Sequence, residues 1–169
     1  MDDARIITRG LASFLGIDAQ GSLEGPPVSS INPLDSRFSS VLNNARILLI
    51  KPSSLGDIVH ALPVVSAIKA QWPGSHLTWV VKRQWAALVE RAEGIDRVWP
   101  LDMTVGSWIR EGRALRAQRF DLAIDLQGLF RSGILAWLSG APARIGFANG
   151  REGGPWFYSD RVPVTDPDI

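Results

Sequence analysis

The stretch ILLIKPSSLGDIVHALPVV, residues 47–65, decides the fold that we expect for this chain. It opens with an unbroken apolar run, which is typical of a strand buried on both faces of a parallel sheet. A turn of small residues follows, and apolar residues three or four apart then predict a helix. Because a proline cannot donate a helical hydrogen bond, Pro63 predicts either a kink or a regular part that begins near His60.

Strand and helix signals alternate from there to the end of the chain. Further strands are predicted at 76–81, 97–101, 120–126 and 143–148, and further helices at 85–92, 107–119 and 129–139. This alternation predicts an α/β fold with a Rossmann-like, doubly wound, mostly parallel sheet. Pro100 predicts that 97–101 is an edge strand. Of the seven tryptophans, Trp79 and Trp137 fit the core.

Residues 1–44 differ from the rest of the chain because they are rich in glycine, proline and serine and have little periodicity. We expect an extension or linker there, partly disordered, ahead of a single domain at 45–169. The first fifteen residues also permit a short amphipathic helix, which would either dock locally or lie at a membrane surface.

Composition excludes several classes of protein. The 169 residues carry a formal net charge of +1, which gives no global reason to expect a nucleic-acid partner. The absence of cysteine excludes disulfides, iron–sulfur clusters and thiol nucleophiles, and two histidines make a histidine-built metal site improbable. We find no signal peptide and no apolar run of membrane-spanning length, so we expect a cytoplasmic protein.

Two segments follow strands whose carboxyl ends should meet, which is where such folds bind ligands. In the first, Ser53 and Ser54 offer hydroxyls to a phosphate or sugar, and Gly56 removes bulk from the turn. Asp57 could accept a proton from an attacking hydroxyl or could cap the helix. His60 could contact a ligand or be a partly buried, hydrogen-bonded histidine.

The second segment follows the strand that ends near Asp125, and it brings Gln127 and Arg131 to the same edge. Arg131 could hold a carboxylate or phosphate through paired hydrogen bonds, or could form a surface salt bridge. Neither segment carries the glycine pattern of a dinucleotide site or the G-K-S/T of a phosphate loop. A nicotinamide enzyme is therefore disfavoured.

Arginines recur every third residue along one predicted helix. Such arginines usually lie on a solvated surface, and the alternative interpretation is that they contact anionic lipid headgroups. The residues are Arg110, Arg113, Arg116 and Arg119.

Three segments closely resemble the amino-terminal domain of heptosyltransferases of glycosyltransferase family 9. They are residues 47–65, FDLAIDLQGLFRSGILA at 120–136 and RIGFANGREG at 144–153. The resemblance covers most of 46–161. It implies the amino-terminal half of a two-domain GT-B glycosyltransferase, without the carboxy-terminal domain that holds the donor. A chain of that extent is expected to be inactive alone.

The resemblance also implies a function. Such enzymes transfer heptose from ADP-heptose to the Kdo of lipid A, with inversion and without a metal or other cofactor, in lipopolysaccharide core biosynthesis at the cytoplasmic face of the inner membrane. Asp57 matches the proposed general base. The residues that the resemblance places at the acceptor are Lys51, Ser53, Ser54, Gly56, Gln127, Arg131 and Arg151.

Two other functions remain open at this stage. The chain could be a non-catalytic α/β module that binds a sugar or phosphate, or a family 9 transferase that acts on another glycan. The sequence alone does not decide among the three.

Overall fold

The computed structural model describes residues 43–102 and 104–163. The extension at 1–44 therefore lies outside the described residues, except for a turn at Asn43 and Asn44. The helix expected within its first fifteen residues lies outside them as well.

A six-stranded sheet forms the centre of the domain, in the order β3-β2-β1-β4-β5-β6. All five strand pairings are parallel, which confirms the doubly wound α/β fold and places β3 at an edge as expected. The strands are β1 (Arg46–Ile50), β2 (His76–Lys82), β3 (Arg97–Leu101), β4 (Leu122–Asp125), β5 (Ala143–Phe147) and β6 (Asp160–Val162).

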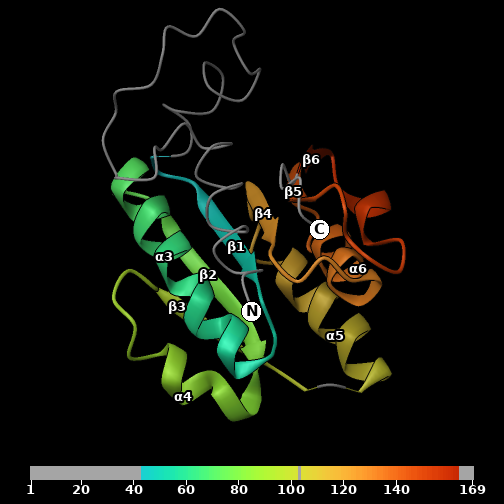
Figure 1. Ribbon diagram of the computed structural model, residues 1–169, viewed down its shortest axis with the longest axis horizontal. Coiled ribbons are helices and arrows are strands. Elements are labelled where there is room, and N and C mark those ends of the chain that lie inside the picture. Colours follow the sequence, from blue (N-terminus) through green and yellow to red (C-terminus); the bar gives the residue numbers. More distant parts are fainter. Residues whose placement is uncertain (1–42, 103, 164–169) are drawn as a thin grey trace, which may run out of the picture.

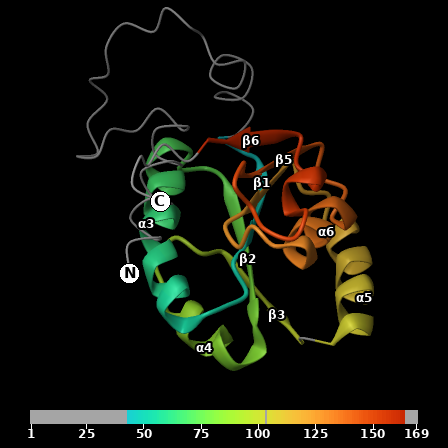
Figure 2. The same cartoon turned by 45° about the vertical axis from the view of Figure 1, so that its right-hand side comes forward.

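Helices cover both faces of this sheet. Figure 1 shows α3 and α4 on one side of it and α5 and α6 on the other, and Figure 2 shows the same two layers from another angle. The helical segments are α3 (Leu55–Gln71), η1 (Arg83–Trp85), α4 (Ala86–Val89), α5 (Val105–Arg116), α6 (Phe130–Leu138) and η2 (Gly154–Phe157). No helix among the described residues has both the length and the apolar character to cross a bilayer.

Each face of the sheet has its own core, and β1 contributes to both. Ile47 and Leu49 pack with residues of α3, whereas Leu48 and Ile50 pack with residues of α5 and α6. Successive side chains of a strand point to opposite faces, so an unbroken apolar strand supplies two cores at once. This explains why the run at 47–50 carries no polar residue.

The helix that contains Pro63 begins before His60, contrary to one of the two alternatives predicted for it. α3 runs without interruption from Leu55 and includes Pro63, so its regular part does not start near His60. Pro63 is exposed, as is Val59 four residues before it. The carbonyl that Pro63 leaves without a helical donor therefore lies on the solvent side, where water can satisfy it.

Two other expectations differ from the structure. The short strand β6 was not predicted, because three residues are too few to show a periodic pattern. Trp137 was expected in the core but is 55% exposed. Its neighbours Leu135 and Ala136 face the sheet and are buried, which turns Trp137 outward on the same helix.

A glycine sets the close approach of α5 to α6. A Cβ added at Gly112 would lie 2.6 Å from Cβ of Leu138, whereas one added at Gly106 in the same helix would meet nothing within 4 Å. Gly112→Ala should therefore lower the free energy of unfolding by about 1–3 kcal/mol through overpacking. Gly106→Ala should be neutral or stabilising, because alanine is the better helix former. Equal stability of the two variants in urea denaturation would contradict this packing.

Candidate functional site

The chain changes winding direction between β1 and β4, the two central strands. It leaves β1 for α3 on one face and leaves β4 for α6 on the other face, although the strands are paired neighbours. The turns that follow them therefore diverge and leave a crevice at the carboxyl edge of the sheet. In open α/β sheets, ligands bind at such a switch point.

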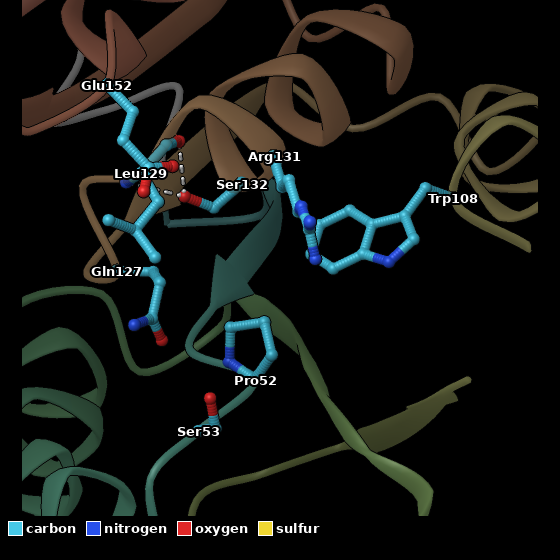
Figure 3. A pocket seen from close by; sticks show the side chains of 8 residues that line it. All are labelled: Pro52, Ser53, Trp108, Gln127, Leu129, Arg131, Ser132 and Glu152. Carbon is cyan, nitrogen blue, oxygen red and sulfur yellow. Dashed lines mark hydrogen bonds between the residues drawn. The ribbon is translucent and has the colours of Figure 1, made fainter. Parts of the chain in front are cut away.

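A pocket of about 280 Å³ lies at this point. It draws residues from the turn after β1, from the amino-terminal end of α6, and from α5 and the loop after β5. Figure 3 shows these side chains. They are Pro52, Ser53, Trp108, Gln127, Leu129, Arg131, Ser132 and Glu152. Three of the predicted site residues, Ser53, Gln127 and Arg131, thus line one pocket.

The start of α6 gives one side of the pocket a positive character. The Ser132 hydroxyl closes the first turn by accepting a hydrogen bond from the Leu129 amide at 3.1 Å and donating to its carbonyl at 2.9 Å. Free amides and the helix dipole favour an anion at such an end. Arg131 is exposed and forms no ion pair with another residue in the described part of the chain. Its guanidinium is available to a ligand.

Two buried polar atoms in the pocket lining have no hydrogen-bond partner among the described residues. They are Nε1 of Trp108 and Oε1 of Gln127. A buried polar atom left unpaired costs about 1–3 kcal/mol, so native structures nearly always satisfy such groups. A donor and an acceptor without partners in one pocket suit a polar, hydroxyl-bearing ligand.

Asp57 caps α3 and remains accessible at the same time. Its Oδ2 accepts hydrogen bonds from the Ser54 amide at 3.0 Å and the Ser54 hydroxyl at 3.2 Å. The same oxygen lies 3.5 Å from Nζ of Lys51, and 46% of the Asp57 side chain is exposed. The capping role considered from the sequence is therefore present, and nearly half of the side chain remains accessible.

The surroundings of Asp57 keep it ionised. Burial raises the pKa of this carboxyl, but the hydrogen bond from the Ser54 amide and the charge of Lys51 lower it, and the resulting pKa is below its ordinary value of 3.8. A carboxyl with a lowered pKa stabilises the fold above its ordinary pKa, and that contribution is lost as the pH falls through the lowered pKa. At neutral pH, Asp57 is thus a carboxylate that can accept a proton.

Lys51 lies beneath Asp57 and does not line the pocket. Only 5% of Lys51 is exposed, and its ammonium contacts the Asp57 carboxylate. Its carbonyl accepts a hydrogen bond from Nε1 of the buried Trp79 at 3.2 Å, which holds the strand end in place. The structure therefore gives Lys51 a place beside Asp57, where a buried positive charge favours the ionised carboxyl.

Other predicted residues lie near the crevice but outside the pocket lining. Ser54, Gly56 and His60 are exposed at the beginning of α3. The partly buried alternative for His60 is therefore wrong, and His60 does not line the pocket. Arg151 is exposed on the loop after β5, and its backbone amide donates to the Gly128 carbonyl at 2.7 Å.

A buried carboxylate holds the two loops that shape the pocket. Asp125 is completely buried, and its Oδ1 accepts hydrogen bonds from the amides of Gln127 at 2.8 Å and Gly128 at 3.2 Å. Its Oδ2 accepts one from the Tyr158 hydroxyl at 2.7 Å. One side chain thus fixes the turn after β4 and the loop that leads to β6.

Burial changes the pKa values of both Asp125 and Tyr158. Burial raises the pKa of Asp125, and the hydrogen bonds that it accepts oppose the rise. Burial raises the pKa of Tyr158 as well, and the adjacent Asp125 adds to that effect. Tyr158 therefore keeps its proton and remains the donor of the pair.

Small residues let the loop after β5 approach the start of α6. A Cβ at Gly133 would lie 2.8 Å from both the Gly154 carbonyl oxygen and the Phe157 ring. A Cβ at Gly146 would meet the ring of Tyr158 at a still shorter distance. Larger residues at either position would push the loop that carries Glu152 away from the pocket.

Sequence reasoning missed five of the eight lining residues. They are Pro52, Trp108, Leu129, Ser132 and Glu152. Pro52, Leu129, Ser132 and Glu152 lie within the segments that suggested the site, close to the polar residues that were chosen. Glu152 follows Arg151 directly, and its positive φ of 58° turns it differently from an extended residue. Trp108 comes from a separate helix, and only the packing of α5 on the sheet brings it here.

The family model for glycosyltransferase family 9 (heptosyltransferase) matches residues 108–168. That range includes α5 from Trp108 onward, β4, α6 and the loop with Glu152, and so most of the pocket lining.

Curated relatives point to the same family. Lipopolysaccharide heptosyltransferase 1 of Pseudomonas aeruginosa is 34% identical over 105 residues, which cover 56% of this chain and 29% of that protein. Lipopolysaccharide heptosyltransferase 1 of Escherichia coli K12 is 32% identical over 103 residues, which cover 53% of this chain and 32% of that protein. The chain spans about a third of the length of these relatives.

Solved structures agree with the fold. The E. coli heptosyltransferase WaaC with ADP-2-deoxy-2-fluoro heptose matches with a TM-score of 0.63 and 26% identity, over 72% of this chain and 43% of that one. WaaC with ADP matches with a TM-score of 0.61 and 29% identity, over 72% and 42%. The likeness to heptosyltransferases of glycosyltransferase family 9 thus extends from the sequence, where the family model matches residues 108–168, to the folded core.

Proposed function

We propose that this chain forms the acceptor-binding part of an inverting, metal-independent heptosyltransferase of lipopolysaccharide core biosynthesis. The donor is ADP-heptose, and the acceptor is the Kdo of lipid A at the cytoplasmic face of the inner membrane. The names of the curated relatives support the transfer of heptose in lipopolysaccharide synthesis, and the ADP-heptose analogue in one of the similar structures supports the choice of donor.

The observation that carries the proposal is the meeting of a polar pocket and an ionised, accessible carboxylate at one switch point. Ser53 lines the pocket, and the next residue, Ser54, binds Asp57. The acceptor in the pocket would therefore lie beside the group that has to accept its proton.

The pocket chemistry suits an acidic sugar. Arg131 can bind the Kdo carboxylate by paired hydrogen bonds, in the field of the α6 amino terminus. The unpartnered Gln127 Oε1 can accept from a sugar hydroxyl, and Trp108 Nε1 can donate to a ring or hydroxyl oxygen. Glu152 offers a further acceptor for hydroxyls. These groups orient the acceptor and do not react.

In this reaction, the only chemical step that the acceptor-binding domain carries out is the acceptance of one proton. The acceptor hydroxyl oxygen forms a bond to the anomeric carbon of the heptose from the face opposite ADP, while the bond from that carbon to the phosphate oxygen breaks. The electron pair of the broken bond leaves with ADP, and the hydroxyl proton passes to the Asp57 carboxylate. Attack from the opposite face inverts the anomeric centre.

A non-catalytic sugar-binding module is the second candidate, and one observation favours it. Both hydrogen bonds that the Asp57 carboxylate accepts come from Ser54, and they are what a helix cap requires. In that case the pocket would bind a glycan, and Asp57 would serve stability alone. A family 9 transferase with another acceptor would keep the catalytic role and change only the pocket ligand.

Arg131→Gln should weaken binding of deacylated Kdo-lipid A to the 169-residue chain by about tenfold or more, because a charge-assisted pair of hydrogen bonds is lost. Isothermal titration calorimetry measures this effect. Arg91→Gln is the matched control, because Arg91 is also exposed but follows α4 on the other face of the sheet. Equal affinity in both variants would remove Arg131 from the site.

Two substitutions at position 57 separate the cap from the base. Asp57→Asn keeps an oxygen that can accept from the Ser54 amide, whereas Asp57→Ala removes it and should cost about 1 kcal/mol of stability. In a longer chain that includes a donor-binding domain, both variants should lose heptose transfer by about 100-fold or more. Near-normal transfer by Asp57→Asn, assayed with radiolabelled ADP-heptose, would favour the cap alone.

Tyr158→Phe should disturb the pocket from outside it. The substitution leaves Oδ2 of the buried Asp125 without its donor, which should cost about 1–3 kcal/mol of stability. Because the loop with Glu152 loses its tether, affinity for deacylated Kdo-lipid A should also fall. Tyr158 does not line the pocket, so unchanged affinity in a destabilised variant would show that the tether does not position the site.

A further inference from the structure

The helix α6 presents an apolar stripe to solvent. Phe130, Ile134 and Trp137 lie at i, i+4 and i+7 and so share one face of the helix. Phe130 is 38% exposed and Trp137 is 55% exposed, whereas Leu135 on the opposite face is completely buried. A stripe of large apolar residues on the outer face of a helix is unusual in a domain whose core is already filled.

The neighbouring helix α5 presents a matching stripe. Ile109, Arg113 and Arg116 have the same i, i+4 and i+7 spacing, all three are exposed, and 48% of Ile109 is accessible. The contact between Gly112 and Leu138 brings the two helices close together. Both helices lie on the same face of the sheet, as Figure 2 shows, so the stripes form one surface. We call it the α5–α6 outer face: Ile109, Arg113, Arg116, Phe130, Ile134 and Trp137.

Positively charged residues outnumber negatively charged ones on these two helices. They contain four arginines and a single acid, Glu111. Glu111 is half-buried and engaged, because it accepts hydrogen bonds from Arg110 at 2.9 Å and from Nε1 of Trp99 at 3.1 Å. The outer face therefore combines exposed aromatic and aliphatic side chains with positive charge that is not neutralised within it.

Aromatic residues extend this surface beyond α6. Phe157 of η2 packs edge to face on Phe130, with ring centroids 5.3 Å apart, and Trp156 beside it is 78% exposed. Tryptophan and arginine are the residues that suit the boundary between acyl chains and headgroups, since each has an apolar body and a polar end.

We infer that the α5–α6 outer face lies on an anionic bilayer surface and holds the pocket next to the membrane. The same two helices supply Trp108 and Arg131 to the pocket lining, so a membrane on the outer face would be adjacent to the acceptor site. This inference rests on the proposed function only in assigning the reason for membrane contact, which is that the acceptor is a lipid.

Charge decides between a bilayer and a second copy of the chain. A symmetric contact between two copies would place the same arginines of each copy close to one another, and like charges oppose such an interface. An anionic lipid surface attracts each arginine with about 1 kcal/mol, which is about fivefold in affinity. Large apolar side chains add binding through the area that they bury in the interface.

Flotation of the 169-residue chain with vesicles tests the inference. One set of vesicles is phosphatidylcholine alone and the other contains about a third phosphatidylglycerol, and neither contains Kdo-lipid A. The chain should float with the anionic vesicles at 0.1 M salt and be released at higher salt, where charge is screened within about 3–5 Å. Trp137→Ser and Ile109→Ser should each weaken binding about tenfold, and Arg113→Gln about fivefold.

Matched controls come from the other face of the sheet. Leu88 on α4 is 45% exposed, close to the 48% of Ile109, and Arg91 is exposed just after the same helix. Leu88→Ser and Arg91→Gln should leave vesicle binding unchanged. Thermal melts should show that all five variants are folded, because each substituted side chain is exposed.

Several results would overturn the inference. Absence of binding of the unmodified chain to anionic vesicles would do so, and so would equal loss in the α4 controls. A dimer in light scattering that Trp137→Ser dissolves would assign the face to a second copy instead. Because the calorimetric test of the acceptor uses a deacylated ligand and no membrane, failure of membrane binding leaves the acceptor proposal standing, and the reverse also holds.

Discussion

The reversal of winding direction between β1 and β4 is the constraint on which the rest of the structure depends. Two paired, parallel strands send their chains to opposite faces, and the backbone cannot close the gap that this leaves at their carboxyl ends. The pocket, the cap at Asp57 and the first turn of α6 all arise at this point. Sequence within β1 supports it, since four consecutive buried residues serve two separate cores.

Two aspartates show how one residue type serves two purposes around this gap. Asp125 is completely buried and accepts hydrogen bonds from two backbone amides and a tyrosine hydroxyl. Its role is therefore to hold the backbone of the two loops in place. Asp57 lies at a helix start, keeps nearly half of its side chain exposed, and has a buried lysine beside it that favours ionisation. Burial and partners, rather than residue identity, assign the structural and the chemical role.

Much of this architecture could be predicted from the sequence, because buried parallel strands leave continuous apolar runs and helices leave periodic ones. The same reasoning brought Ser53, Gln127 and Arg131 to one edge, where the structure has its pocket. It failed where the information is not local. Trp108 reaches the pocket only through the packing of α5, and β6 pairs with β5 across a loop that has no strand pattern. Trp137 was misplaced because an apolar residue on an outer face looks, in sequence, like one in the core.

The proposed function requires that the acceptor and Asp57 meet at the turn after β1, and a crystal structure of the chain with deacylated Kdo-lipid A tests this directly. We expect the Kdo carboxylate on Arg131, and a Kdo hydroxyl within about 2.6–3.2 Å of the Asp57 carboxylate, as proton transfer requires. A ligand bound away from the β1 and β4 turns, or one in the pocket with no hydroxyl near Asp57, would contradict it.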